Sequence, residues 1–352
     1  MREQLEFRRS SIVSRPSFLT RRQPVKPGSS AERGAALLTV LLLVALMGAI
    51  CVAALDRLRM STALAINSAA LDQARAYAIG VESLITLAVD DLLAVDAERT
   101  ILRPGEAGLV RQIPLPQGGN ARIVLSDGAN CFNVNSVADG AHPARLVTRP
   151  AGVAQFTALL QLLDVPGQTA AAIANSAADW VDGDGEPNPG GGEDALYAGR
   201  QVAYRVGNTL FADPSELRAL ASMTPAIFEQ MQPWLCALPT TELSPINVNT
   251  LTLEQAPLLA MLAPGRISVD EARQAIAARP AGGWGSTSEF LVGTGLAAGD
   301  MSLDVQMQPQ LRTRWFEADL TVRQGDMEFA QKMLIDARIR PVRVVARTWG
   351  LQ

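Results

Sequence analysis

A run of acidic and glycine residues at positions 179–197, DWVDGDGEPNPGGGEDALY, carries the strongest chemical signal in the sequence. Oxygen-bearing side chains recur at alternate positions from Asp182 onward, and the twelfth residue counted from it is another acid. A calcium ion takes about six to eight oxygen ligands, and alternate oxygens with an acid at position twelve are typical of a calcium loop. The candidate metal ligands are Asp182, Asp184, Glu186, Asn188, Glu193 and Asp194.

The match of this acidic loop (residues 179–197) to an EF-hand is partial. Pro187 stands where the EF-hand has glycine, and the glycines at 190–192 come late. A solvated surface loop has a similar composition of Asp, Gly and Pro. Five close carboxylates repel one another unless a cation neutralises them, which favours a metal site. We therefore predict calcium as a cofactor, with Asp179 and Asp213 as further candidate ligands.

Enzymatic chemistry is hard to build from this sequence. The single histidine, His142, precedes Pro143, a setting typical of a loop. The sequence has no glycine-rich phosphate loop followed by lysine, no Cys/His cluster and no nucleophile beside a base. A glycosidase-type carboxylate pair in the acidic loop is the remaining enzymatic alternative. We predict that the protein is not an enzyme and has no catalytic residues.

Charge is distributed unevenly along the 352 residues. Eight basic and three acidic residues precede residue 35, which leaves 23 basic and 32 acidic residues and a net charge of −9 for the rest. An acidic body does not suit non-specific binding to nucleic-acid phosphates. Residues 35–55 then carry no charge over about 30 Å of helix, enough to cross a bilayer. The positive-inside rule places residues 1–34 in the cytoplasm and the rest of the chain across the membrane after a single pass.

The start of this apolar run separates two alternatives. A cleaved secretory signal would be shorter and would end in small residues, whereas a plain signal anchor fits the hydropathy. The junction Glu32-Arg33-Gly34, however, resembles the processing site of type IV pilins and type II secretion pseudopilins. That resemblance implies that a prepilin peptidase cuts after Gly34 and methylates the new N-terminus, Ala35.

One position departs from the pilin pattern. The class usually has Glu at the fifth mature position, where it pairs with the N-terminus of a neighbouring subunit, and this chain has Thr39 there. A carboxylate buried in the bilayer without its partner is costly, so a subunit with none above it gains by losing it. In this respect the chain resembles the K subunit of the pseudopilins.

The remaining chain predicts an α+β fold. No proline occurs between residues 35 and 101, so the N-terminal helix should continue past the membrane, to about 55–60 residues in all. Alternating apolar and polar residues flank turns at 117–120 and 324–326, which predicts antiparallel hairpins at 103–126 and 316–337. Between the hairpins the pattern is helical. We predict a pilin-like long helix packed on an antiparallel sheet, with a large all-α domain inserted between the strands.

The helical region contains an internal repeat. Asn133-Val134-Asn135-Ser136 recurs as Asn247-Val248-Asn249-Thr250, and each motif precedes two short amphipathic helices joined by a Pro-Gly turn. The Ser or Thr that ends each motif is a candidate helix cap. The predicted domains are a cytoplasmic leader (1–34), a transmembrane half-helix (35–55), the soluble half-helix with the first strands (56–135), the inserted helical domain with two helix-hairpin-helix-like repeats (136–308) and the last strands (309–352).

From residue 32 onward, these features together resemble the type II secretion minor pseudopilins of the general secretion pathway protein K family. The resemblance rests on the processing site, Thr39, the two Asn-Val-Asn motifs, the acidic loop and the WFEADLTV strand. It implies a subunit at the tip of the pseudopilus that helps initiate and limit the fibre during export of folded proteins across the outer membrane. It also implies a tip complex with I- and J-type minor pseudopilins, and calcium in the helical domain.

A rival prediction comes from the second repeat, since residues 258–276 and the WGSTSEFLVGTGL that follows resemble helix-hairpin-helix modules. In DNA-binding examples, backbone N–H groups at the hairpin hold a phosphate. Here Pro264 supplies no N–H, and Asp270 and Glu271 accompany Arg266. A DNA-binding or competence-type membrane protein is therefore the alternative, and nucleic acid is not an expected partner.

The three cysteines fall in two settings. Cys51 lies in the apolar run and should act there as a small apolar residue. Cys131 and Cys236 lie in the head, in a compartment where disulfides persist, and could pair.

Overall fold

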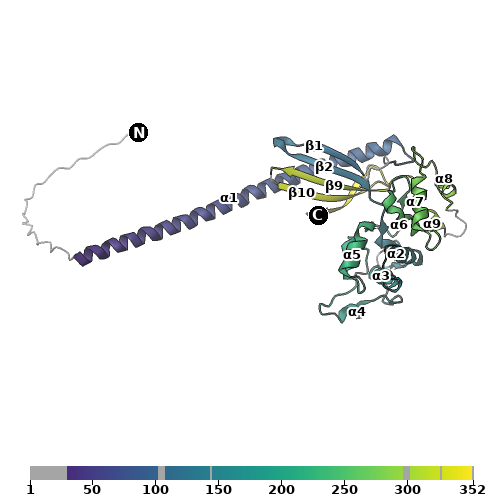
Figure 1. The fold of residues 1–352 in the computed structure, drawn as a ribbon, viewed down its shortest axis with the longest axis horizontal. Coiled ribbons are helices and arrows are strands. Elements are labelled where there is room, and N and C mark those ends of the chain that lie inside the picture. The colour runs from purple at the N-terminus through teal and green to yellow at the C-terminus, as the bar shows by residue number, and fades with distance from the viewer. Residues whose placement is uncertain (1–29, 102–107, 143–144, 296–301, 326, 351–352) are drawn as a thin grey trace, which may run out of the picture. The chain divides into compact units, whose positions relative to one another are not determined.

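The computed structural model of the chain describes residues 30–101, 108–142, 145–295, 302–325 and 327–350. The chain divides into residues 1–66 and a compact unit, residues 67–352, which we call the head. Helix α1 (Ser30–Val95) has 66 residues and belongs to both (Figure 1). The predicted leader lies outside the described residues except for its last few, which already belong to α1.

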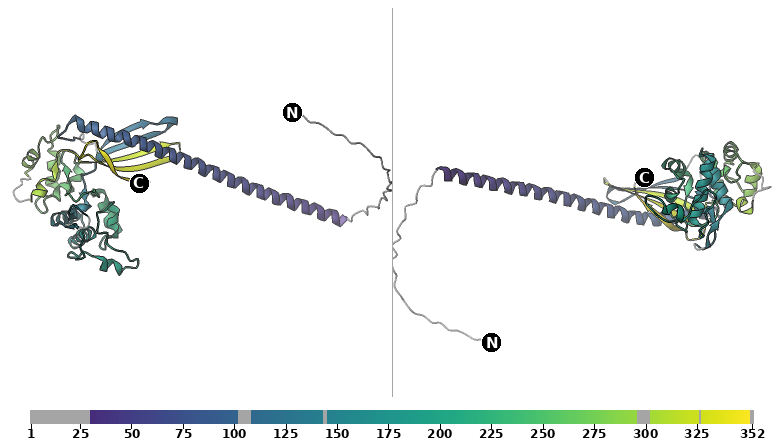
Figure 2. Two further views of the ribbon diagram at one scale, coloured as in Figure 1. Left: turned by 180° about the vertical axis from the view of Figure 1, so that it is seen from behind. Right: turned by 90° about the horizontal axis from the view of Figure 1, so that it is seen from below.

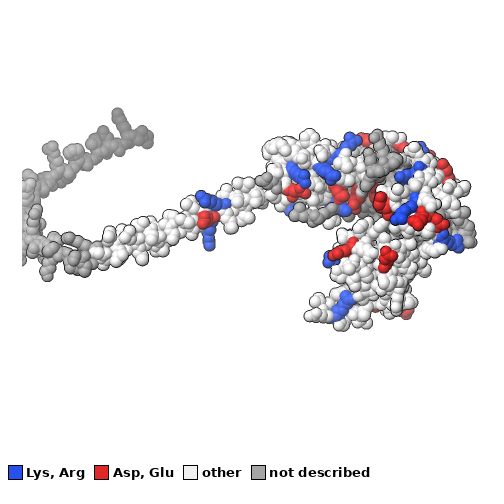
Figure 3. Space-filling view, viewed as in Figure 1, with Lys and Arg blue, Asp and Glu red and all other residues white. Residues whose placement is uncertain are grey.

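Helix α1 confirms the prediction of one long N-terminal helix. Within the described residues it is the one helix long and apolar enough to cross a membrane. Its large apolar side chains from Leu37 to Ile66 are exposed, and Figure 3 shows this segment free of charge apart from one group, residues 56–59. The helix ends at Val95 because the Asp96 carboxylate accepts bonds from the N–H groups of Glu98 and Arg99, at 2.9 and 3.0 Å.

A five-stranded antiparallel sheet forms the frame of the head, in the order β1-β2-β9-β10-β11 (Figures 1 and 2). Both predicted hairpins are confirmed, and they lie side by side because β2 pairs with β9. Every second residue of the strands packs against α1, where Val81 and Ile85 meet a cluster that includes Leu320. The strands are β1 (Leu109–Pro114), β2 (Asn120–Asp127), β9 (Trp315–Gln324), β10 (Met327–Asp336) and β11 (Arg343–Trp349).

The residues between β2 and β9, which we call the insert, have their own apolar core, from Phe132 to Val305. Its main helices are α2 (Pro150–Leu162), α3 (Gly167–Val181), α4 (Asp194–Ala198), α5 (Pro225–Met231), α6 (Ala256–Ala260), α7 (Val269–Ala277), α8 (Thr287–Gly293) and α9 (Leu303–Gln306), with the 3-10 turns η2 (Val134–Val137), η4 (Pro214–Ala219) and η6 (Leu253–Gln255). Two-residue strands pair as β3 (Phe132–Asn133) with β6 (Leu235–Cys236), β4 (Ala138–Asp139) with β5 (Val147–Thr148), and β7 (Ile246–Asn247) with β8 (Pro309–Gln310).

The four asparagines of the repeated motif are fully buried, and we call them the Asn clamps. The second Asn of each motif exchanges two bonds with one backbone residue. Asn135 accepts from Phe211 N at 2.7 Å and donates to Phe211 O at 2.9 Å, while Asn249 accepts from Trp284 N at 2.7 Å and donates to Trp284 O at 3.1 Å. Each clamp thus satisfies buried backbone groups where no strand partner is available.

The predicted Ser and Thr helix caps are wrong. The 3-10 turn η2 is capped by Asn133, and α2 begins only after Arg149. The Ser136 hydroxyl is buried without a hydrogen bond, and the Thr250 hydroxyl donates instead to Asp127, at 2.8 Å, at the end of β2. Burial raises the pKa of the Asp127 carboxyl. This bond ties the second repeat to the sheet.

Candidate metal centre

The acidic loop leaves the last turn of α3, which is the element that positions its first acids. Asp182 ends the helix in an extended conformation and donates its N–H to Ala178 O at 2.8 Å. Strand β5 holds the other side, because Thr148 donates its hydroxyl to Asp182 Oδ2 at 2.8 Å. The loop therefore starts from a fixed side chain.

Three of the predicted ligands converge. Oxygen atoms of Asp182, Asp184 and Glu193 all lie within 4.8 Å of one another. Asp182 and Glu193 are buried, at 1% and 8% exposure, and Asp184 is exposed. Asp182 Oδ1 and Glu193 Oε1 are buried oxygens without a hydrogen-bond donor. Because such atoms are costly to bury unpaired, they fit a site completed by a cation.

The electrostatics of the cluster point the same way. Burial, together with the charges of Asp184 and Asp179, raises the pKa of Asp182 to about 6. Burial and the neighbouring carboxylates, Asp179 foremost, raise the pKa of Glu193 to about 7. Carboxyl groups whose pKa values are raised this close to neutral pH lack a nearby positive charge. A hard divalent cation with oxygen ligands would supply it.

Asp179, a further candidate ligand, instead orients the loop. It is fully buried and accepts bonds from Asn188 N at 2.9 Å, Asn188 Nδ2 at 2.6 Å and Gly192 N at 2.6 Å. A Cβ atom at Gly191 would lie 2.1 Å from Asp179 Oδ2, so the backbone can approach this carboxylate only as glycine. Gly191, one of the late glycines that depart from the EF-hand pattern, therefore lets the loop fold over Asp179.

The other predicted ligands lie in different contacts. Asn188 donates to Asp179 and to Thr148, Glu186 is exposed, and Asp194 accepts from Val206 N at 3.0 Å. Asp213 caps η4 by accepting from Ser215 N at 2.8 Å. Sequence spacing missed Thr148, because it comes from a strand more than thirty residues earlier. The structure thus brings together three of the six predicted ligands.

Cys131 and Cys236 form a disulfide, with Cα atoms 5.8 Å apart. The bond lies beside the β3–β6 pair and closes the first repeat between its Asn motif and its last strand. Cys51 is a free thiol on the exposed part of α1.

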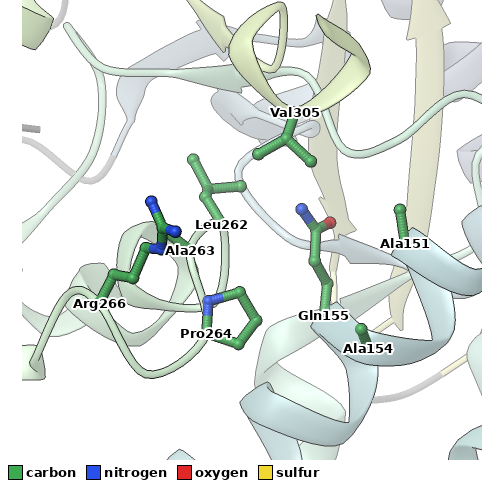
Figure 4. A pocket seen from close by; sticks show the side chains of 8 residues that line it. All are labelled: Ala151, Ala154, Gln155, Leu262, Ala263, Pro264, Arg266 and Val305. Carbon is green, nitrogen blue, oxygen red and sulfur yellow. The ribbon is translucent and has the colours of Figure 1, made fainter. Parts of the chain in front are cut away.

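The two repeats face each other across a small pocket of about 190 Å³ (Figure 4). Ala151, Ala154 and Gln155 of α2 line one side, and the turn between α6 and α7 lines the other with Pro264 and Arg266. Gln155 also exchanges amide bonds with Gln308, at 2.6 and 3.2 Å. The hairpin that the rival prediction assigned to a DNA phosphate therefore faces another helix of the insert, which does not favour that alternative.

Comparisons with known proteins agree with this architecture. Sequence profiles described as type II secretion system (T2SS), protein K match residues 130–240 and 246–313. Type II secretion system protein K of Pectobacterium carotovorum subsp. carotovorum is 33% identical over 326 residues, which cover 91% of this chain and 97% of the relative. The protein K of Klebsiella pneumoniae shows the same identity and coverage.

A solved structure is also similar. A chain in the crystal structure of the GspK-GspI-GspJ complex from the enterotoxigenic Escherichia coli Type 2 Secretion System superposes with a TM-score of 0.68 and 30% identity. The match covers 80% of this chain and 97% of that chain. With an apolar N-terminal helix consistent with a single-pass membrane anchor, the chain belongs to the type II secretion system protein K family and is a minor pseudopilin of that system.

Proposed function

We propose that this minor pseudopilin caps the tip of the pseudopilus, where it helps initiate the fibre and limits its length. The insert is the observation that carries the proposal. Gly128 N donates to Trp315 O at 2.9 Å, so the chain leaves and re-enters the sheet at one point. The insert is added to the pilin frame there, as a bulk that would hinder a further subunit from stacking above.

Thr39 supports the same position in the fibre. Its hydroxyl donates to Ala36 O at 2.8 Å, within its own helix. The side chain therefore offers no carboxylate to the N-terminus of a subunit above it, which a subunit in the middle of the fibre would need.

The proposed partners are the I- and J-type minor pseudopilins, a prepilin peptidase that cuts between Gly34 and Ala35, and the inner membrane. The similarity to the GspK-GspI-GspJ complex supports the first. We assign the protein a structural role rather than an enzymatic one, with its N-terminus cytoplasmic and its head periplasmic. N-terminal sequencing of the membrane-extracted protein should begin at methylated Ala35. A start at any other residue would reject the processing site.

The proximity of Gly128 and Trp315 allows a direct test of the tip proposal. A short turn joining β2 to β9 would remove the insert while keeping the pilin sheet. In cells that lack the native protein, the full chain should restore short pseudopili, whereas the insert-free variant should leave them long. Retention of the variant in the membrane fraction checks that it is made and anchored. Short fibres with the variant would contradict the proposal.

We also propose that the acidic loop binds calcium through Asp182, Asp184 and Glu193. The two orphaned buried oxygens and the raised pKa values support it. Calcium titrated into the chelator-treated full chain should release heat at one strong site. The Asp184→Asn/Glu193→Gln double variant should lose this binding. The Asp270→Asn/Glu289→Gln variant, with the same charge change outside the loop, should keep it. Equal binding by both variants would reject the site.

A further inference from the structure

A groove separates the outer face of the sheet from the insert. Helix α1 covers one face of the sheet, and residues on the opposite face of β9, β10 and β11 line a space together with residues of η4 and α5. Figure 1 shows α5 on the side of the insert that faces the strands. The space between them measures about 770 Å³, within the roughly 300–1,000 Å³ typical of binding sites. One rim is the edge strand β11, where Trp349 is 65% exposed, so the groove opens along the edge of the sheet.

Carboxylates outnumber bases inside the groove. Asp213 from the start of η4 and Glu317 and Asp319 from β9 gather around one base, Lys332 of β10. Lys332 Nζ lies 2.9 Å from Glu317 Oε1 and 3.8 Å from Asp319 Oδ1. Although burial acts against it, these carboxylates and Asp213 raise the pKa of Lys332. Three negative charges therefore share one positive charge.

One of these carboxylates is incompletely bonded. Asp319 Oδ1 is buried without a hydrogen-bond donor, because 3.8 Å to the Lys332 ammonium is beyond hydrogen-bond range. The Asp319 side chain as a whole is 39% exposed, so its carboxylate is still accessible from the groove. The groove therefore has an excess of negative charge that a basic ligand can reach.

The surfaces around the carboxylates are small and apolar. Ala330 and Ala346 form part of the floor, and Phe228 lies in the opposite wall. The aliphatic stems of lysine and arginine pack on such surfaces while their charged heads reach carboxylates. A bare metal ion fits less well, because the Lys332 ammonium already lies between Glu317 and Asp319. Anions and nucleic acid would be repelled.

We propose that this groove binds an extended segment of a partner protein that carries lysine or arginine at alternate positions. The segment follows the sheet from the open edge at β11. Its basic side chains enter the groove and add donors for Asp319, Glu317 and Asp213, as alternate side chains do in strand-like peptide recognition. The site is independent of the acidic loop and of any metal there.

The test uses the full chain in detergent and a fluorescein-labelled nonapeptide that alternates lysine and threonine. Anisotropy should show binding that weakens as salt rises, and the peptide with glutamate in place of lysine should not bind. The Glu317→Gln/Asp319→Asn variant should bind at least about tenfold more weakly. Ala346→Arg, at an exposed position of β11, should have a similar effect by placing a guanidinium on the floor.

The matched control is Glu254→Gln/Asp270→Asn, which removes two exposed charges from the second repeat and should bind like the unaltered protein. Chelator should not change the affinity, which separates this outcome from the fate of the calcium site. The proposal is overturned if the lysine peptide does not bind, or if both double variants bind it equally. It is also overturned if spermine, a small polyamine, displaces the peptide as well as an unlabelled copy does.

Discussion

The two repeats of the insert share a structural device and differ in chemistry. Both begin with buried Asn clamps, and in both the second Asn exchanges bonds with one backbone residue, Phe211 in the first repeat and Trp284 in the second. Only the first repeat adds the acidic loop and the Cys131–Cys236 disulfide. The clamps thus explain why the motif recurs. The acidic loop and the disulfide show that the first repeat has features beyond this shared fold.

The second half of each repeat also differs in length. In the first, Phe211 follows Val181 by thirty positions, and this span holds most of the acidic loop and α4. In the second, α7 and Trp284 are only a few residues apart, and Gly283, with φ +72°, lets the chain turn directly onto Asn249. This longer span places Tyr197, which is fully buried, against Trp180, and the Cys131–Cys236 disulfide closes the part of the chain that contains it.

Loss of the disulfide should have the largest effect. The bond closes a loop of 105 residues, so the Cys131→Ser/Cys236→Ser variant should lose about 4.8 kcal/mol of unfolding free energy by the chain-entropy relation. Guanidinium unfolding of the full chain in detergent, followed by tryptophan fluorescence, measures this loss. Cys51→Ser, on the exposed part of α1, is the control and should leave the midpoint unchanged. An unchanged midpoint in the double variant would mean that the first repeat does not rely on this bond.

Replacement of a clamp asparagine should give the next largest loss of stability, and the loss should be similar in the two repeats. Asn135→Ala removes three hydrogen bonds and Asn249→Ala removes two, and both leave buried backbone groups unpaired. We expect each to lower the unfolding free energy by about 3 kcal/mol. Asn67→Ala, at an exposed position of α1, should change it by less than about 0.5 kcal/mol. If replacing Asn135 or Asn249 changes the unfolding free energy as little as the control does, the two repeats do not share this stabilising arrangement.

The pH dependence that Asp182 and Glu193 give the metal-free protein should be a smaller effect. The folded pKa values of Asp182 and Glu193, about 6 and about 7, lie above the ordinary 3.8 and 4.5. The folded state therefore holds protons that the unfolded chain releases, and the stability they contribute is present at low pH and lost as pH rises through 6 and 7. In chelator, the melting temperature should fall between pH 5 and 8.

Glu193→Gln should flatten that curve, because the amide does not titrate. Calcium should restore stability most at the high end of the range, where the carboxylates are ionised. A metal-free melting temperature that is constant or rises from pH 5 to 8 would show that these carboxylates are not crowded as the structure has them.

Local patterns were sufficient to predict the frame of the head. The proline-free apolar run predicts α1, and alternation around Gly325 predicts the β9–β10 hairpin. Each of these patterns is contained in one continuous segment of the sequence. Strand β11 was not singled out, since a register shift between Leu334 and Ile335 breaks the alternation across the pair. The pairing of β2 with β9 joins residues almost 200 positions apart, which no local pattern contains.

For the same reason, only part of the candidate metal centre was predicted from the sequence. Spacing within the acidic loop identified Asp182, Asp184 and Glu193, but it could not separate them from Asp194, which turns toward Val206. Thr148 lies on another strand and gave no signal. The Asn clamps were visible as a repeat, yet their partners are distant backbone groups, so the sequence pointed to local caps instead.

Hydrogen exchange of the full chain, measured by mass spectrometry in calcium and in chelator, tests the contrast between the repeats most directly. If the first repeat alone holds the metal, calcium should slow amide exchange across the acidic loop and the last turn of α3. Exchange across residues 246–313 should stay the same in both conditions. Identical exchange of the acidic loop with and without calcium, or an equal change in both repeats, would contradict this account.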